Sequence, residues 1–295
     1  MTSGSGPPET AESFGSGEVF VDRTIGELAS RPVVSVEAET TVMAALQLMS
    51  ARRISCVVVL QQDEPIGILT ERDVVFAANW VLGQPDLRMR EVMSKPVLTA
   101  LSETTITDAY RLFQEHRIRH LVVLSPRMEL DGIFTQTNLV SALRSKFFAG
   151  MGEVSGLMSS QVVHVSPQVT ARHALALMAS HAISAVVVGE QGRPLGMFTE
   201  RDAVRLVATG ADIGNLPVSA VMSAPVQTIQ AAASPVDALE LMASREVRRL
   251  LVLDSQGGMA GVLTQTDLSR VVEHRAIAWG NPPDALTAQS PTLLH

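Results

Sequence analysis

The stretch Gly67-Ile68-Leu69-Thr70-Glu71-Arg72-Asp73 ends an apolar run with Gly, two apolar residues, Thr, two polar residues and an acid. The same pattern returns three times, once with Asn in place of the final acid. The threonines of successive copies are 65, 64 and 65 residues apart. A fixed internal period indicates that one small structural unit is repeated along the chain. The other copies are Gly132-Ile133-Phe134-Thr135-Gln136-Thr137-Asn138, Gly196-Met197-Phe198-Thr199-Glu200-Arg201-Asp202 and Gly261-Val262-Leu263-Thr264-Gln265-Thr266-Asp267.

The repeat has a second level of order. The first and third copies share Thr-Glu-Arg-Asp, whereas the second and fourth share Thr-Gln-Thr followed by Asn or Asp. Thr70 and Thr199 are 129 residues apart, and so are Thr135 and Thr264. The chain therefore contains a two-unit module of normal domain size that occurs twice, plus tails.

Each unit reads as β-α-β-β-α, which is an α+β pattern. A short β-type run comes first, at residues 32–36, 96–99, 162–165 and 225–229. A helix follows with apolar residues at i, i+3, i+4 and i+7, and its predicted N-caps are Thr41, Thr105, Thr170 and Ser234. Two apolar strands joined by a polar turn come next, and the Thr of the repeated motif opens a second helix. A unit this small buries its apolar faces only by pairing with a neighbour.

This order of elements, the Met-Ser-x-Pro sequence that opens two units and the closing Gly-φ-φ-Thr-x-x-Asp motif (φ is apolar) resemble the CBS domain, named after cystathionine β-synthase. The opening sequences are Met93-Ser94-Lys95-Pro96 and Met222-Ser223-Ala224-Pro225. The resemblance covers roughly residues 18–275. It implies four CBS repeats, at about 24–80, 89–145, 154–209 and 218–275, in two CBS pairs (Bateman modules) over 18–145 and 146–275. Two pairs can stack as a flat disc-like pseudo-dimer, and the sequence leaves open whether one chain or a homodimer forms it.

Composition limits the partners and the cellular location. A formal net charge of −7 argues against a nucleic-acid partner. No apolar stretch approaches the ~20 residues that span a membrane, and no signal peptide opens the chain, so we expect a cytoplasmic protein. Residues 1–17 are predicted to be a disordered tail, and 276–295 a Pro-containing tail. The single cysteine, Cys56, begins an apolar strand and is predicted to be a buried thiol.

The resemblance also implies roles in binding an adenosine nucleotide. In the CBS family the Asp of the closing motif accepts hydrogen bonds from the ribose hydroxyls, and the Thr donates toward the phosphate. An amide lacks the charge of a carboxylate, so Asn138 is expected to hold a diol more weakly than an acid would. The same spacing also fits a helix capping box, and the two roles are compatible. By position, the Asp role falls on Asp73, Asp202 and Asp267, the second unit departs from the pattern with Asn138 at this position, and the Thr role falls on Thr70, Thr135, Thr199 and Thr264.

Basic residues precede the central strand of the second and fourth units. Family members that bind adenine nucleotides contact phosphates with a His/Arg pair here, and the matching residues are Arg119, His120, Arg248 and Arg249. The planar fork of arginine suits phosphate. The alternative is that these arginines cover a helix end or pair with surface carboxylates. The base is expected to lie against apolar residues such as Val34, Ile54, Val163 and Ile183.

The sequence carries no pattern of a catalytic site. The seven histidines lack metal-ligand spacing, and neither a nucleophile elbow nor a Walker A loop is present, so we expect no enzyme, no metal site and no catalytic cofactor. The expected function is regulatory: AMP, ADP, ATP or S-adenosylmethionine binds between repeats and changes their relative angle, which a protein partner reads. Two alternatives stay open, a truncated or detached input arm of a cyclic-dinucleotide synthase or kinase, and a scaffold with silent sites.

Overall fold

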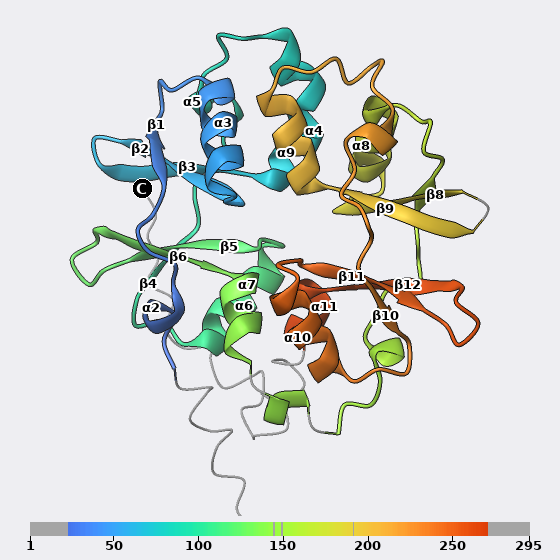
Figure 1. The fold of residues 1–295 in the computed structure, drawn as a ribbon. Coiled ribbons are helices and arrows are strands. Elements are labelled where there is room, and N and C mark those ends of the chain that lie inside the picture. Colours follow the sequence, from blue (N-terminus) through green and yellow to red (C-terminus); the bar gives the residue numbers. More distant parts are fainter. Residues whose placement is uncertain (1–22, 144, 149, 191, 271–295) are drawn as a thin grey trace, which may run out of the picture.

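The computed structural model describes residues 23–143, 145–148, 150–190 and 192–270 (Figure 1). The tails predicted over residues 1–17 and 276–295 lie outside these ranges. Within them the chain forms four β-α-β-β-α units in the predicted order, which confirms the α+β fold class and the number of repeats. The units are numbered 1 to 4 along the chain, with units 1 and 2 forming pair 1 and units 3 and 4 forming pair 2.

Each unit contains a three-stranded sheet in which the middle strand pairs with both others. The first strand runs parallel to the middle strand and the third runs antiparallel to it. The middle strands are continuous apolar runs because both of their faces are covered. The strands are β1 (Ser35–Glu37), β2 (Cys56–Gln61), β3 (Glu64–Thr70), β4 (Thr99–Leu101), β5 (His120–Leu124), β6 (Leu130–Thr135), β7 (His164–Val165), β8 (Ala185–Glu190), β9 (Arg193–Thr199), β10 (Thr228–Gln230), β11 (Arg249–Leu253) and β12 (Met259–Thr264).

Two helices belong to each unit. The first begins at a Thr or Ser whose side chain accepts a hydrogen bond from the backbone N–H three residues on, as predicted. These first helices are α3 (Val42–Arg52), α6 (Ile106–Glu115), α8 (Ala171–Ser180) and α10 (Pro235–Ser244), and the second helices are α4 (Glu71–Gly83), α7 (Gln136–Ala142), α9 (Glu200–Ala208) and α11 (Gln265–Ser269). Short helices α2 (Ile25–Leu28) and α5 (Met89–Val92) and 3-10 turns at Ser145–Phe148, Val154–Gly156 and Val218–Ala220 lie between them.

Sheets join the units of a pair, and helices join the two pairs. Val58 and Ile68 of unit 1 share an apolar cluster with Val122 and Ile133 of unit 2, and a corresponding cluster joins units 3 and 4. One helical core contains α3, α4, α8 and α9 of units 1 and 3, and a second joins units 2 and 4 (Figure 1). Unit 1 therefore faces unit 3 and unit 2 faces unit 4, so the disc-like arrangement forms within one chain.

The segment that opens each unit crosses to the sheet of its partner unit. Ser94 of unit 2 bridges to Ile68 on β3, and Ser30 of unit 1 makes the reciprocal bridge to β6. A Cβ atom added to Gly67 would lie 2.3 Å from the sulfur of Met93. The absence of a side chain at Gly67 therefore leaves room for Met93 of the partner's opening segment.

Candidate functional site

The repeated Thr-x-x-Asp motif forms a capping box at the second helix of every unit. In unit 1 one carboxylate oxygen of Asp73 accepts hydrogen bonds from the backbone N–H and the hydroxyl of Thr70, both at 2.7 Å. The Thr70 oxygen accepts in turn from the N–H of Asp73 at 3.4 Å. The capping interpretation is thus confirmed. The boxes of the other units are Thr135 with Asn138, Thr199 with Asp202, and Thr264 with Asp267.

The second carboxylate oxygen of the motif acid has partners of its own. On Asp73 it accepts from the Ser94 hydroxyl at 3.2 Å, and on Asp202 from the Ser223 hydroxyl at 2.9 Å. Arg205 also donates to this oxygen of Asp202 at 3.0 Å. Asp202 is only 3% exposed, so a ribose would have to displace existing partners there. The predicted ribose role of these acids stays a prediction.

Asn138 makes the corresponding contact with a serine, but here the motif residue is the hydrogen-bond donor and the serine is the acceptor. The side-chain oxygen of Asn138 keeps the capping role and accepts from the Thr135 N–H at 2.9 Å. Its amide nitrogen donates to the Ser30 hydroxyl at 3.0 Å, whereas Ser94 in the equivalent place donates to Asp73. A serine hydroxyl can donate or accept, so the change from acid to amide leaves the local hydrogen bonds satisfied.

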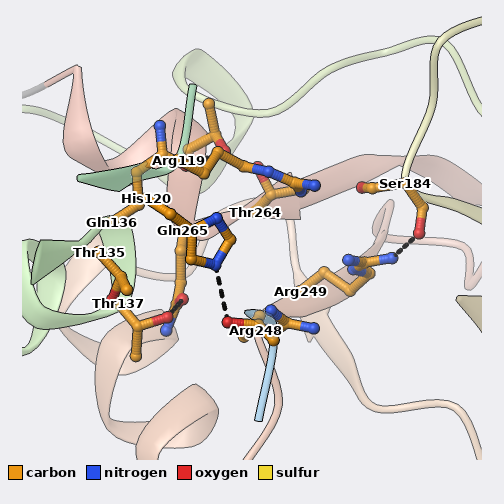
Figure 2. A pocket seen from close by; sticks show the side chains of 12 residues that line it. Arg119, His120, Thr135, Gln136, Thr137, Ser184, Arg248, Arg249, Thr264 and Gln265 are labelled. Atoms are coloured by element: carbon orange, nitrogen blue, oxygen red, sulfur yellow. Dashed lines mark hydrogen bonds between the residues drawn. The ribbon is translucent and has the colours of Figure 1, made fainter. Parts of the chain in front are cut away.

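The four basic residues singled out from the sequence gather at one place, named the centre, where residues of all four units line a cavity (Figure 2). They line a polar cavity of ≈ 40 Å³ together with Ser55, Ser184 and the threonines of units 2 and 4. His120 Nε2 lies 2.8 Å from the Ser55 oxygen, and Arg249 donates to the carbonyl of Ser184. The basic residues are Arg119, His120, Arg248 and Arg249. Their contact with a phosphate stays a prediction.

This environment shifts the ionisation of two central groups. Burial, with the neighbouring Arg119, Arg248 and Arg72, lowers the pKa of His120 to about 3, so the imidazole is neutral at physiological pH. Burial and the repulsion of Arg248 lower the pKa of Arg249 to about 10, which leaves the guanidinium charged at neutral pH. The centre thus carries arginine charge but no histidine charge.

Two buried carboxylates that the sequence reasoning missed hold these arginines. Glu71 and Glu200 are 2% and 1% exposed. Arg119 donates to both carboxylate oxygens of Glu200, at 2.9 and 2.7 Å, and Arg248 donates to Glu71. Burial would raise the pKa of Glu71, but its ion pairs to Arg248 and Arg201 outweigh burial and lower the pKa. Arg119 and Arg248 therefore do pair with carboxylates, but with buried ones, whereas Arg249 donates to a backbone carbonyl.

Glutamines take the place of these acids in units 2 and 4. Thr137 donates to the side-chain oxygen of Gln265 at 2.8 Å, and Thr266 donates to that of Gln136 at 2.7 Å. The residue after the motif Thr thus reaches across the disc in all four units, as Glu in the odd units and Gln in the even ones. The alternation of Thr-Glu-Arg with Thr-Gln-Thr was the signal in the sequence that could have revealed these contacts.

A further cavity lies between the two units of each pair. The cavity of pair 1 has a volume of ≈ 580 Å³ and is named the Asn138 cleft, and that of pair 2 has ≈ 260 Å³ and is named the Asp267 cleft. A smaller cavity of ≈ 180 Å³ lies beside Thr199. The Asn138 cleft is lined by Val34, Ile54, Thr135, Asn138, Arg201 and Arg248 among others, and the Asp267 cleft by Val163, Ile183, Thr264, Asp267, Arg72 and Arg119.

Over residues 23–143, 145–148, 150–190 and 192–270, no cluster of His, Cys, Asp and Glu side chains is suited to hold a metal ion. In the same ranges no helix has the length and apolar character needed to cross a bilayer.

The chain matches a known family over most of its length. The sequence profile of the CBS domain matches residues 25–79, 89–145, 153–209 and 218–274. The CBS domain-containing protein YhcV of Bacillus subtilis is 41% identical over 120 residues, which are 40% of this chain and 84% of YhcV. The meiotically up-regulated gene 70 protein of Schizosaccharomyces pombe is 26% identical over 316 residues, covering 85% of this chain but only 43% of the yeast protein.

Among solved structures, protein MJ1225 of Methanocaldococcus jannaschii, described as a candidate archaeal homologue of g-AMPK, superimposes with a TM-score of 0.75. The two chains are 19% identical, and the match covers 86% of this chain and all of MJ1225 (100%). At this level of identity the likeness shows a shared fold of four repeats.

Proposed function

This chain belongs to the CBS domain family, and we propose that it is a regulatory protein that senses an adenosine compound bound between its repeats. AMP, ADP, ATP and S-adenosylmethionine are the candidate ligands. We treat the protein as a sensor rather than an enzyme because the four repeats make up most of the described residues and the groups that line the clefts suit the binding of a nucleotide.

The Asn138 cleft is the observation that carries the proposal. Its ≈ 580 Å³ lies within the range of small-molecule sites. Val34 and Ile54 offer an apolar surface for a base, Asn138 an acceptor for ribose hydroxyls, and Arg201 and Arg248 charge for a phosphate. A nucleotide needs these three kinds of group in one cavity.

The other motif residues are proposed to play the same parts in their own units. The threonines would donate toward phosphate and the motif acids would accept from ribose, in exchange for the capping hydrogen bonds they make now. Arg119, His120, Arg248 and Arg249 would contact phosphates at the centre, with His120 as a neutral hydrogen-bonding group.

Bound ligand would act by changing the angle between units. A ligand shifts such an equilibrium only as far as its affinities for the two arrangements differ. Both clefts are lined by residues from both pairs, so a ligand there contacts the groups whose relative position it would change. A protein partner that recognises one arrangement would then receive the signal.

The first experiment is calorimetry and thermal-shift titration against AMP, ADP, ATP, S-adenosylmethionine and cyclic di-AMP. Ligand at a hundred times its dissociation constant should stabilise the fold by about 2.7 kcal/mol. A saturating response to one adenosine compound supports the proposal and identifies the input. Flat responses to all of them contradict it and favour a scaffold with silent sites.

Two matched variants test the role of the motif residue. Asn138→Asp restores the carboxylate and should tighten binding in the Asn138 cleft, because a charged acceptor holds a ribose diol more strongly. Asp267→Asn should weaken binding in the Asp267 cleft for the same reason. Unchanged affinities in both variants would show that this position does not hold the ribose.

A further inference from the structure

The carboxylate of Glu71 in pair 1 holds two arginines that come from pair 2. Arg201 Nε lies 3.4 Å from one oxygen of Glu71, and Arg248 donates to the other oxygen. Glu71 is 2% exposed, so these cations are the groups that compensate for its removal from water. Two ion pairs therefore cross from one pair to the other at this carboxylate.

Glu200 of pair 2 repeats the arrangement in the opposite direction. Arg119 and Arg72, both of pair 1, lie 2.7 and 3.6 Å from its oxygens. Glu71 and Glu200 occupy the same position of the Thr-Glu-Arg-Asp motif, 129 residues apart. The two sets of contacts are thus related by the pseudo-two-fold symmetry of the disc.

The same arginines line the clefts. Arg201 and Arg248 line the Asn138 cleft of pair 1, and Arg72 and Arg119 line the Asp267 cleft of pair 2. Each cleft therefore presents guanidinium groups from the opposite pair, and each of those groups is bound to a carboxylate of the pair that contains the cleft. An anion entering a cleft meets arginines that already have an anionic partner.

We propose that Glu71 and Glu200 compete with the phosphate of a bound ligand for these arginines, so that ligand binding weakens the ion pairs that join the two halves of the disc. The inference rests on the proposed function, since it requires a ligand with a phosphate or a similar anion. A phosphate offers the arginine fork the same kind of paired acceptors as a carboxylate, and two anions at one fork repel each other. A bound phosphate therefore replaces the glutamate carboxylate as the partner of the arginine.

The exchange connects ligand chemistry to the geometry of the whole molecule. A nucleoside without phosphate can fill a cleft and leave the ion pairs intact. A nucleotide draws the arginines toward the cleft and releases the glutamate, which changes the contact between pairs. The presence of phosphate, rather than occupancy alone, would thus set the arrangement of the disc.

The test compares the wild type with Glu71→Gln by calorimetry, using AMP, adenosine and inorganic pyrophosphate as probes. Removing the competing charge should tighten AMP and pyrophosphate binding by about fivefold or more, the usual size of a coupling between sites, and leave adenosine binding unchanged. Glu64→Gln is the matched control, because it removes the same charge from an exposed residue on β3. Glu71→Asp keeps the charge, and with it a buried ion pair, but shortens the side chain. It should therefore give a smaller gain in affinity for AMP and pyrophosphate than Glu71→Gln.

The outcomes separate this inference from the proposed function. If the wild type binds AMP and both Glu71 variants bind AMP with the same affinity as the wild type, the proposed competition is wrong and the sensor function stands. If the wild type binds no nucleotide, the sensor function fails. The competition between the glutamates and an anion is then tested with pyrophosphate alone. A larger rise in melting temperature with pyrophosphate in the Glu71 variants than in the wild type then supports the competition, and equal rises, including none, overturn it.

Discussion

His120 is kept neutral by burial and by the arginines around it. Its pKa falls from an ordinary 6.5 to about 3 in the folded protein, whereas the unfolded chain regains the ordinary value. Between these values the unfolded state binds more protons than the folded state. The contribution of His120 to stability is therefore fully present above pH 6.5 and is lost as the pH falls toward 3.

We predict that His120→Gln makes stability less dependent on pH in this window. Gln can still reach the Ser55 oxygen but does not titrate, so it removes a slope of at most about 1.4 kcal/mol per pH unit. Urea unfolding at pH 5 and pH 7.5 measures the change. The wild type should lose more stability between these two conditions than the variant, and equal losses would show that His120 is not held neutral in the fold.

Cys56 is the second residue whose chemistry is set by its place in the fold. It begins β2 at the contact between the sheets of pair 1 and is 8% exposed, so the predicted buried thiol is confirmed. Burial, together with the nearby charges of Glu71 and Asp73, raises the pKa of the thiol to about 12. The thiolate, which is the reactive form, is therefore scarce at neutral pH.

The predicted consequence is a thiol that reacts only when the protein opens. At pH 8 the native chain should react with a colorimetric disulfide reagent far more slowly than the chain in urea, because the unfolded thiol recovers an ordinary pKa of about 8.5. The absorbance of the released reagent follows both reactions. Equal rates in the two conditions would contradict the burial and the raised pKa.

At the scale of elements, the Gly of the closing motif packs against a segment that is distant from it in the sequence. In unit 3 a Cβ atom on Gly196 would lie 2.5 Å from the sulfur of Met222 and 2.8 Å from the carbonyl oxygen of Ser223. Both belong to the opening segment of unit 4, which bridges to β9. Neither the backbone carbonyl nor the paired strand can move away easily.

Gly196→Ala is therefore predicted to destabilise the chain by about 1–3 kcal/mol, the usual cost of forcing a group into a packed core. Urea unfolding measures the loss. Gly83→Ala is the matched control, because a Cβ atom at this last residue of α4 meets no heavy atom within 4 Å. A Gly196 variant as stable as the control would show that the opening segment does not constrain the motif.

Periodicity and caps predicted the elements because both are local. The order β-α-β-β-α and the Thr and Ser caps need only neighbours a few residues away in the chain. The first strands begin later than predicted, β1 at Ser35 rather than residue 32 and β10 at Thr228 rather than 225. The residues just before each first strand connect it to the segment that crosses to the partner sheet, which contains Ser30 in unit 1. No local sequence pattern encodes that crossing.

In the candidate site too, the features that depend on local spacing could be predicted and those that depend on distant contacts could not. The motif residues could be found from their spacing, and the reversed hydrogen bond of Asn138 could not, because its partner Ser30 lies 108 residues away. The alternation of Glu with Gln after the motif Thr marked Glu71 and Glu200, but it did not identify their partners, which lie in other units. Contacts between repeats, rather than within them, are the part that sequence reasoning missed.

At the scale of the whole molecule, neither pair can bury its helices alone. In the helical core shared by units 1 and 3, α4 packs against α8 and α9, and α3 packs against α9. The second core joins α7 of unit 2 to α10 and α11 of unit 4. Removing one pair would expose the apolar faces of the other, and apolar surface of this kind is unstable in water.

A fragment of residues 23–143, which contains pair 1 alone, is therefore predicted to form a symmetric homodimer. The α4 helix normally packs against α9, which holds the same position in its own unit, so a second copy offers α4 a closely similar face. Arg119 pairs with Glu200 in the full chain, and a second copy would offer Glu71 at that place.

Light scattering on the fragment and on the full chain at equal concentration measures the two masses. We expect a dimer for the fragment and, because the disc is complete within one chain, a monomer for the whole protein. Ala78→Asp on α4 puts a charge where a 2% exposed alanine packs in the helical core, and should reduce the fragment to monomers. A wild-type fragment that stays monomeric and unfolds cooperatively would mean that the helical core between pairs is not what holds a pair together, and the stability of each pair would then have to come from the contact between its two sheets.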